Sequence, residues 1–175
     1  MGYYTIASPG TNFNTNKTMI GVFNGAGSGR VVRLYRAWLL NNQTTAVTGV
    51  NVLLELRGLT TGSGGTSIIP TKHDTEDEAL PSQVITATNM TTTTSTLFRR
   101  CYWSSDEPVA AGPNSKDEIQ TIPYMNIIWD SYWSYNNSTV QPIVLRAGEG
   151  IALICTTVTT VGVVDAFFEI SVGTT

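Results

Sequence analysis

Two glycine-rich corners come closest to known catalytic or phosphate-binding patterns in this chain. In LRAGEGIAL, from Leu145 to Leu153, a lone Glu149 lies between glycines where two apolar runs meet, and such a carboxyl could serve as a catalytic acid. The second corner, GAGSG at residues 25–29, lacks the Lys-Ser/Thr pair of a phosphate-binding loop and the full spacing of a dinucleotide-binding loop. It also separates two expected strands instead of opening a helix, so we interpret GAGSG as a turn.

A further candidate for chemistry is the loop PTKHDTEDEALP, which holds the single histidine of the chain, His73. His73 and Asp74 could supply two members of a catalytic triad, but no marked nucleophile such as Gly-x-Ser-x-Gly accompanies them. The clustered carboxylates could bind calcium, although the EF-hand calcium-loop pattern is absent. The cluster consists of Asp74, Glu76, Asp77 and Glu78. We expect a solvated acidic loop, no metal, no cofactor and no enzymatic activity.

The two cysteines, Cys101 and Cys155, lie in different apolar runs. Neither belongs to a Cys-x-x-Cys or Cys/His pattern of the kind that binds zinc, so we expect two buried, reduced thiols. The chain begins without the basic and apolar regions of a secretory signal, and no apolar run reaches about 18 residues. We therefore expect synthesis in a cytoplasm and no membrane partner.

The composition favours a β-protein with uncharged polar faces. Charged residues make up 13% of the 175 residues, about half of ordinary usage, while threonine, asparagine, serine and glycine supply the polarity. The formal net charge is -3, and basic residues gather only at Arg30, Arg33 and Arg36. A protein that binds nucleic acid through its phosphates presents a basic face, so we expect no nucleic-acid partner.

The elements that must position these residues are strands. Alternation is clear in VNVLLELRGL, where Val52, Leu54 and Leu56 share one face. The last run, GVVDAFFEISV, alternates in the same way, with one face formed by Val164, Ala166, Phe168, Ile170 and Val172. In RVVRLYRAWLLNN, Val32, Leu34, Trp38 and Leu40 would share a face interrupted by Arg36. The three-residue spacing of the arginines there also fits a helix, but β-branched and aromatic residues favour a strand. The expected strands are 18–24, 30–42, 50–59, 83–88, 95–103, 142–147, 150–158 and 162–172.

Eight strands with turns between them predict an all-β, antiparallel β-sandwich or barrel, and a jelly roll is the natural eight-strand choice. We expect one domain at residues 18–175, in which 104–141 form a long insertion, preceded by an extended arm at residues 1–17. The arm has little apolar periodicity, and its aromatic residues would anchor it to a partner. These anchors are Tyr3, Tyr4 and Phe13.

The insertion is rich in aromatic residues, and three roles remain open for them. They could plug the end of the core, contact a subunit or another partner, or bind a glycan. The residues are Tyr124, Trp129, Tyr132, Trp133 and Tyr135. A second surface is expected on GIALICTTV, which is apolar on both faces although a sandwich strand needs one buried face. A neighbouring subunit, most simply in a homotrimer, would cover it through Ile151, Leu153 and Ile154.

Three long runs of the chain resemble small jelly-roll virion proteins of tailed bacteriophages, of the capsid decoration or cement type. The runs are VVRLYRAWLLNNQTTAVTGVNVLLELRGLT, GGTSIIPTKHDTEDEALP and PIVLRAGEGIALICTTVTTVGVVDAFFEISV. The resemblance covers most of the chain from about Arg30, apart from the insertion between Trp103 and Gln141.

The resemblance implies a jelly roll, a trimer, and a place on the outside of a capsid whose major capsid protein is the partner. Assembly would take place in the host cytoplasm. It brings no catalytic residues. RAGEG would then be a hairpin corner in which Gly148 and Gly150 adopt unusual backbone angles and Glu149 faces solvent. The alternative function is a receptor- or glycan-binding head of a fibre or tail protein.

Overall fold

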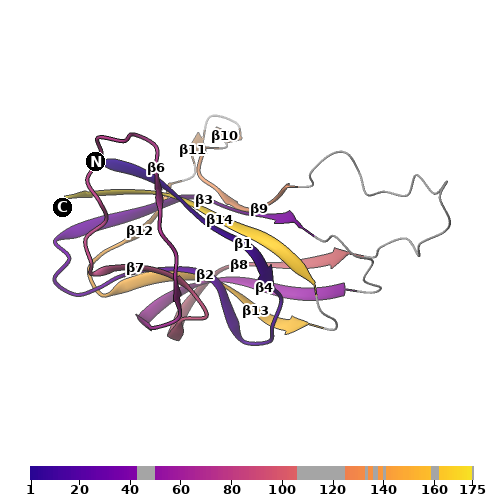
Figure 1. Ribbon diagram of the computed structural model, residues 1–175. Helices are drawn as coiled ribbons and strands as arrows, with labels where there is room; N and C mark the ends of the chain where they lie inside the picture. The colour runs from indigo at the N-terminus through magenta and orange to yellow at the C-terminus, as the bar shows by residue number, and fades with distance from the viewer. Residues whose placement is uncertain are drawn as a thin grey trace.

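The computed structural model describes residues 1–42, 50–105, 125–132, 134–135, 138–139, 141–158 and 162–174. Within these residues the chain is all-β, with two antiparallel sheets and no helix. Figure 1 shows the sheets as two layers, one containing β1, β3 and β14 and the other containing β2, β4 and β13. The predicted all-β antiparallel architecture is therefore confirmed.

The first sheet, called sheet A, has the strand order β6-β1-β14-β3-β12, and β9 pairs with a second part of β3. Every pairing in it is antiparallel. The central strands are β3 and β14. The bounds are β1 Gly2–Asn12, β3 Arg30–Asn41, β6 Thr71–Lys72, β9 Met125–Asp130, β12 Ile143–Leu145 and β14 Val163–Thr174.

The second sheet, sheet B, has the order β5-β7-β2-β13-β4-β8. Its bounds are β2 Lys17–Asn24, β4 Val50–Ser63, β5 Thr66–Ser67, β7 Val84–Thr88, β8 Thr91–Ser105 and β13 Glu149–Val158. A separate two-stranded ribbon joins β10, Ser134–Tyr135, to β11, Ser138–Thr139. The threonine-rich residues 89–94 lie between the expected strands 83–88 and 95–103, but most of them belong to the start of β8.

The core lies between the inner faces of the two sheets, and two predicted alternations are confirmed there. In β4, Val52, Leu54 and Leu56 are fully buried, and Phe168 is a large fully buried side chain from β14. Side chains from both sheets form one continuous apolar cluster. The predicted inner face of the last strand is buried along its length: Val164, Ala166, Phe168, Ile170 and Val172.

The predicted face of β3 is wrong beyond Leu34. The pairing of β3 with β14 shifts by one residue there, and Tyr35 is the extra residue. Because side chains alternate with a period of two, such a bulge moves every later side chain to the opposite face. Ala37 and Leu39 are consequently the buried residues, while Trp38 lies on the outer face.

The expected N-terminal arm is also wrong, because residues 2–12 form a strand of sheet A. β1 pairs with β14 from Gly2 to Asn12, with a bulge at Pro9 and Gly10. Tyr4, Ile6 and Phe13 are 3%, 0% and 6% exposed and belong to the core cluster. Those apolar side chains bury area that a free arm would leave in water, so β1 is part of the domain.

The long insertion is partly built into the sandwich. β9, from within residues 104–141, pairs with β3 and places Ile128 in the core. Residues 106–124 lie outside the described residues. The expected excursion is therefore anchored at its C-terminal part by a strand of sheet A.

The second face of β13 is covered by the chain itself. Ile151 and Leu153 are fully buried on the inner face. On the outer face, Ile154 is 7% exposed and packs with Ala152 and Leu59, with Phe23 against them. The expectation that a neighbouring subunit must cover Ile151, Leu153 and Ile154 is therefore wrong, because neighbouring residues of sheet B exclude water from this strand.

Candidate binding face

The LRAGEG corner is a turn that is stabilised by its own glutamate. Gly148 has φ +85°, and its N–H donates to the Asn24 carbonyl at 2.7 Å. A carboxylate oxygen of Glu149 accepts the Arg146 N–H at 2.7 Å, and the Glu149 N–H donates to the Arg146 carbonyl at 3.0 Å. A corner with an exposed Glu149 that caps it is present between two late strands, but the predicted hairpin is wrong. β12 belongs to sheet A and pairs with β3, whereas β13 belongs to sheet B, so the corner carries the chain from one sheet to the other.

Gly150 fills a different role from the one expected. It is not among the described residues with positive φ. A Cβ atom at this position would lie 2.7 Å from both the Phe23 ring and the Val22 carbonyl oxygen. The position therefore requires glycine because β2 approaches closely, and the turn itself uses the left-handed backbone of Gly148.

The acidic loop fastens β1 and β3 to the side of the sandwich. Asp77 accepts the Tyr3 N–H at 3.1 Å, and the Tyr4 hydroxyl donates to the Glu78 carbonyl oxygen at 2.6 Å. The Glu78 carboxylate forms an ion pair with Arg30 at 2.8 Å. The Asp77 carboxylate thus holds β1, and the Glu78 carboxylate holds β3.

His73 is exposed and lies 2.8 Å from the Thr5 hydroxyl through its Nε2 atom. A catalytic triad needs a carboxylate at one imidazole nitrogen and a nucleophile at the other, and the described residues do not place such a pair around His73. Nowhere in the described residues are three or more His, Cys, Asp or Glu side chains grouped so that they could hold a metal ion. Cys101 and Cys155 are free thiols, and burial raises the pKa of each.

The outer face of sheet A carries a group of aromatic and apolar side chains that we call the aromatic face. Tyr132, Ile127 and Tyr3 are 52%, 40% and 37% exposed. The other members are half-buried and come from β3 and β14. The aromatic face consists of Tyr3, Tyr35, Trp38, Ile127, Tyr132 and Phe167.

One half of the aromatic face is a row across three strands. Phe167 of β14 is opposite Trp38 of β3, which is opposite Ile127 of β9. The Trp38 and Phe167 rings stack with their centroids 5.0 Å apart and an interplanar angle of 7°. This row exists because the bulge at Tyr35 turns Trp38 outward.

The other half is a cluster of three tyrosines. Tyr35 stacks on Tyr132, with centroids 5.3 Å apart and planes 10° apart, and lies 6.0 Å from the Tyr3 ring. The Ser171 hydroxyl is 3.4 Å from the Tyr35 hydroxyl. Burial raises the pKa of Tyr3 and of Tyr132 above the ordinary value, so both hydroxyls are protonated and neutral near pH 7.

One arginine and one aspartate at the edge of this cluster are paired with each other. Arg36 forms an ion pair with Asp130 at 3.0 Å, and its guanidinium lies 5.3 Å from the centre of the Tyr132 ring. Asp130 also accepts the Tyr132 N–H at 2.8 Å. The ion pair and the cation–π contact hold Tyr132 in place beside Tyr35.

The predicted contact residues divide among three places. Tyr3 and Tyr132 lie on the aromatic face, whereas Tyr4 and Phe13 belong to the core. Trp129 is half-buried and packs against the core, with an edge-to-face contact to Phe98 at 6.4 Å, as in the core-plug interpretation. Tyr124 and Trp133 lie outside the described residues, and Tyr135 is described through its backbone in β10 alone.

Sequence reasoning missed four members of the aromatic face: Tyr35, Trp38, Ile127 and Phe167. For Phe167 a signal was present, because it alternates with the buried Ala166 and Phe168 and so must point outward. For Tyr35 and Trp38 no local signal could have placed them, since their faces depend on the bulge against β14.

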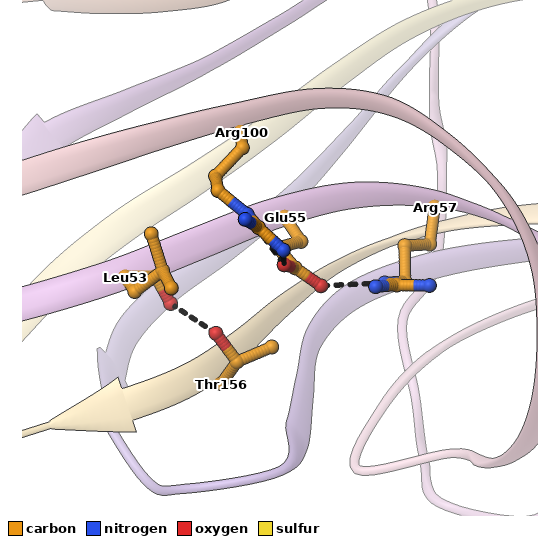
Figure 2. Close-up of polar contacts among 5 residues, drawn as sticks. All are labelled: Leu53, Glu55, Arg57, Arg100 and Thr156. Atoms are coloured by element: carbon orange, nitrogen blue, oxygen red, sulfur yellow. Dashed lines mark hydrogen bonds and ion pairs between the residues drawn. The ribbon is translucent and has the colours of Figure 1, made fainter.

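Sheet B presents a different outer face, which holds a buried carboxylate. Figure 2 shows Glu55 of β4 between Arg57 and Arg100, with Arg57 Nε 2.5 Å from a carboxylate oxygen. Glu55 is 3% exposed, and its pKa is lowered mainly by the Arg57 hydrogen bond, with Arg100 adding to this and burial opposing it. Nearby, the Thr156 hydroxyl donates to the Leu53 carbonyl at 3.1 Å. This network satisfies a buried charge and is structural.

Comparison with known proteins gives no match to a family model, to a characterised protein or to a solved structure. No helix long and apolar enough to cross a membrane occurs in the described residues.

Proposed function

We propose that this chain is a structural virion protein that binds the outer face of a tailed-bacteriophage capsid and stabilises it as a decoration or cement protein. The aromatic face is the proposed contact with the major capsid protein. The resemblance in the sequence first suggested this role, and two features of the molecule support it.

The first is the strand order, which supports a jelly roll. Eight strands, taken in chain order as β1, β2, β3, β4, β8, β12, β13 and β14, pass from one sheet to the other at each step except that from β4 to β8, as the strands of a jelly roll do. In sheet A the successive neighbours are β1, β14, β3 and β12, which are the first, eighth, third and sixth of these strands. In sheet B they are β2, β13, β4 and β8, which are the second, seventh, fourth and fifth.

The second is the aromatic face, which is the observation that carries the proposed contact. Aromatic residues and arginine are enriched in protein interfaces because they bury large areas and keep a polar group available. An outer sheet face that carries two stacked aromatic pairs and an exposed isoleucine is a surface of that composition. The N-terminal residues contribute through Tyr3 on this face and not as a mobile arm.

A homotrimer remains part of the proposal on the strength of the resemblance alone. The apolar outer face of β13 does not require a neighbouring subunit, because Leu59 and Phe23 of the same chain cover it. Sedimentation of the purified protein measures the oligomeric state, and a stable monomer at micromolar concentration would remove the trimer from the proposal.

The test of capsid binding uses capsids that lack this protein. Purified chain is added to them, and bound protein and heat resistance of the capsids are measured. A variant with Ile127→Ser and Tyr132→Ser should bind at least tenfold more weakly, because two interface contacts of more than about 1 kcal/mol each are lost. The matched control is Ile69→Ser, which removes an 89% exposed isoleucine outside the aromatic face and should bind like the unaltered chain.

If both variants bind capsids equally well, the contact with the capsid does not involve the aromatic face. Binding of the unaltered protein to immobilised glycans or to host cells, and never to capsids, would contradict the decoration role. It would favour the receptor- or glycan-binding head instead, for which the same exposed rings would stack on sugar.

A further inference from the structure

We propose that Arg33 is the charged anchor of the aromatic face and that it pairs with an aspartate or glutamate of the capsid partner. This inference rests on the proposed function and adds the chemistry that the partner must present. It depends on which arginines of the chain already pair with a carboxylate.

Four arginines already have a carboxylate partner within the chain. Arg30 pairs with Glu78 and Arg36 with Asp130, while Arg57 and Arg100 share one carboxylate. Arg33 pairs with no carboxylate in the described residues. Its one hydrogen-bond contact there is a weak one, from Nη1 to the Met1 sulfur at 4.0 Å.

Two other arginines, Arg99 and Arg146, also form no ion pair with a described residue, but both are exposed and solvated by water. Arg33 differs from them because its side chain is half-buried. A half-buried guanidinium has lost part of its hydration without gaining a counter-ion, and such a group gains from a partner that supplies one.

The position of Arg33 makes it part of the tyrosine cluster. It lies opposite Ser171 of β14 and Val144 of β12, and Tyr3 lies opposite Ser171 on the next strand. Tyr35 follows it by two residues on β3. Arg33 is close enough to the Tyr3 hydroxyl to oppose electrostatically the rise in the pKa of Tyr3.

The aromatic and apolar surroundings of Arg33 favour, as its binding partner, a carboxylate on an apolar protein surface. Interface residues that contribute most to binding are often Arg, Tyr and Trp, and apolar neighbours keep water out of the contact. A carboxylate accepts two parallel hydrogen bonds from a guanidinium, and such a pair strengthens as water is excluded. Val144, 38% exposed, and Met1, 68% exposed, give the apolar rim at this position.

A single arginine without a carboxylate partner, beside an aromatic cluster, is a poor match to a nucleic acid or an anionic membrane, which attract several cations together. The charge pattern therefore favours a protein partner. Loss of binding on treatment of the capsids with a reagent that amidates carboxyl groups would accord with this, whereas unchanged binding would oppose it.

The test compares three variants in the capsid-binding assay, at low and at moderate salt. Arg33→Met keeps the length and apolar stem of the side chain but removes the charge, and it should weaken binding about tenfold. Arg33→Lys keeps the charge without the bidentate geometry and should recover part of the loss. Arg99→Met removes an exposed, unpaired arginine at the edge of sheet B and should bind like the unaltered chain.

Salt provides a readout that a merely structural role would not change. Added salt should weaken binding of the unaltered chain more than binding of Arg33→Met, because salt screens the ion pair that the variant lacks. Thermal unfolding of each variant shows that the fold is retained. If the unaltered chain binds capsids and Arg33→Met binds equally well with the same salt dependence, the anchor is refuted and the proposed function stands. If the unaltered chain does not bind capsids, both fall together.

Discussion

Replacement of Ile6 by alanine tests whether the N-terminal residues are a strand of the core or an arm for a partner. Ile6 is 0% exposed and packs in the core cluster from β1, opposite Phe168 of β14. Replacing a fully buried isoleucine by alanine costs about 2–5 kcal/mol through lost transfer energy and the cavity left behind. We expect about 3 kcal/mol here, a large part of the roughly 5–15 kcal/mol that stabilises an ordinary domain.

The assay is urea unfolding of the purified chain, followed by tryptophan fluorescence and extrapolated to zero denaturant. The matched control is Tyr3→Ala on the opposite face of the same strand. Tyr3 is 37% exposed and its ring contacts Tyr35, so the variant should lose about 1 kcal/mol or less. The difference between the two variants isolates burial, because both lie on β1 and both shorten a side chain to alanine.

An arm would give the reverse pattern. If Ile6→Ala left the free energy of unfolding unchanged while both variants lost capsid binding, β1 would not be part of the folded core. Deletion of residues 1–12 extends the test, since it removes the antiparallel partner of β14 and exposes the polar backbone of that strand. The truncated chain should fail to fold, and a cooperative unfolding transition near that of the full chain would refute the assignment.

Three more outcomes follow from the polar contacts and the thiols. Glu55→Gln should destabilise the fold by about 2 kcal/mol at pH 7, since the partly solvated guanidiniums of Arg57 and Arg100 lose the buried carboxylate with which both of them pair. The folded pKa of Glu55 is lowered, so its contribution is present above the unfolded pKa of about 4.3 and is lost as pH falls through the folded pKa. Unfolding curves of the variant and the unaltered chain should therefore converge in acid, and a pH-independent difference would contradict the ion-pair account. Cys101 and Cys155 should react slowly with thiol reagents in the native state at pH 7, because burial raises both pKa values, and quickly after denaturation; fewer than two reactive thiols in the denatured, unreduced chain would reveal a disulfide. Glu149→Ala should cost about 1 kcal/mol through loss of its bond to the Arg146 N–H, while Glu149→Gln, which keeps an acceptor, should lose less; equal losses in thermal unfolding would show that the side-chain acceptor is unimportant.

Some features of this protein are determined by short stretches of its sequence. The alternation in β4 and β14 fixes which side chains face the core, because successive side chains of a strand point to opposite faces. Phe168 is buried for that reason, and the corner at Gly148 follows from a residue that tolerates positive φ. The expectation of free thiols at Cys101 and Cys155 likewise needed no knowledge of the pairing of strands, and the structure has both cysteines unpaired. The expected burial holds for Cys155, whereas Cys101 is only half-buried.

Other features depend on how distant strands pair, and only the tertiary structure decided them. β1 enters the core because it pairs with β14, more than a hundred residues later in the chain, and its apolar residues then face the opposite sheet. Ile154 is covered because Leu59 of the neighbouring strand lies beside it, not because a subunit is present. Trp38 reaches the aromatic face because one extra residue in β3, Tyr35, shifts the register against β14. The alternation of residues within one strand does not reveal where its pairing with a neighbouring strand shifts by one residue. The face that Trp38 occupies is therefore determined by the hydrogen bonds between strands.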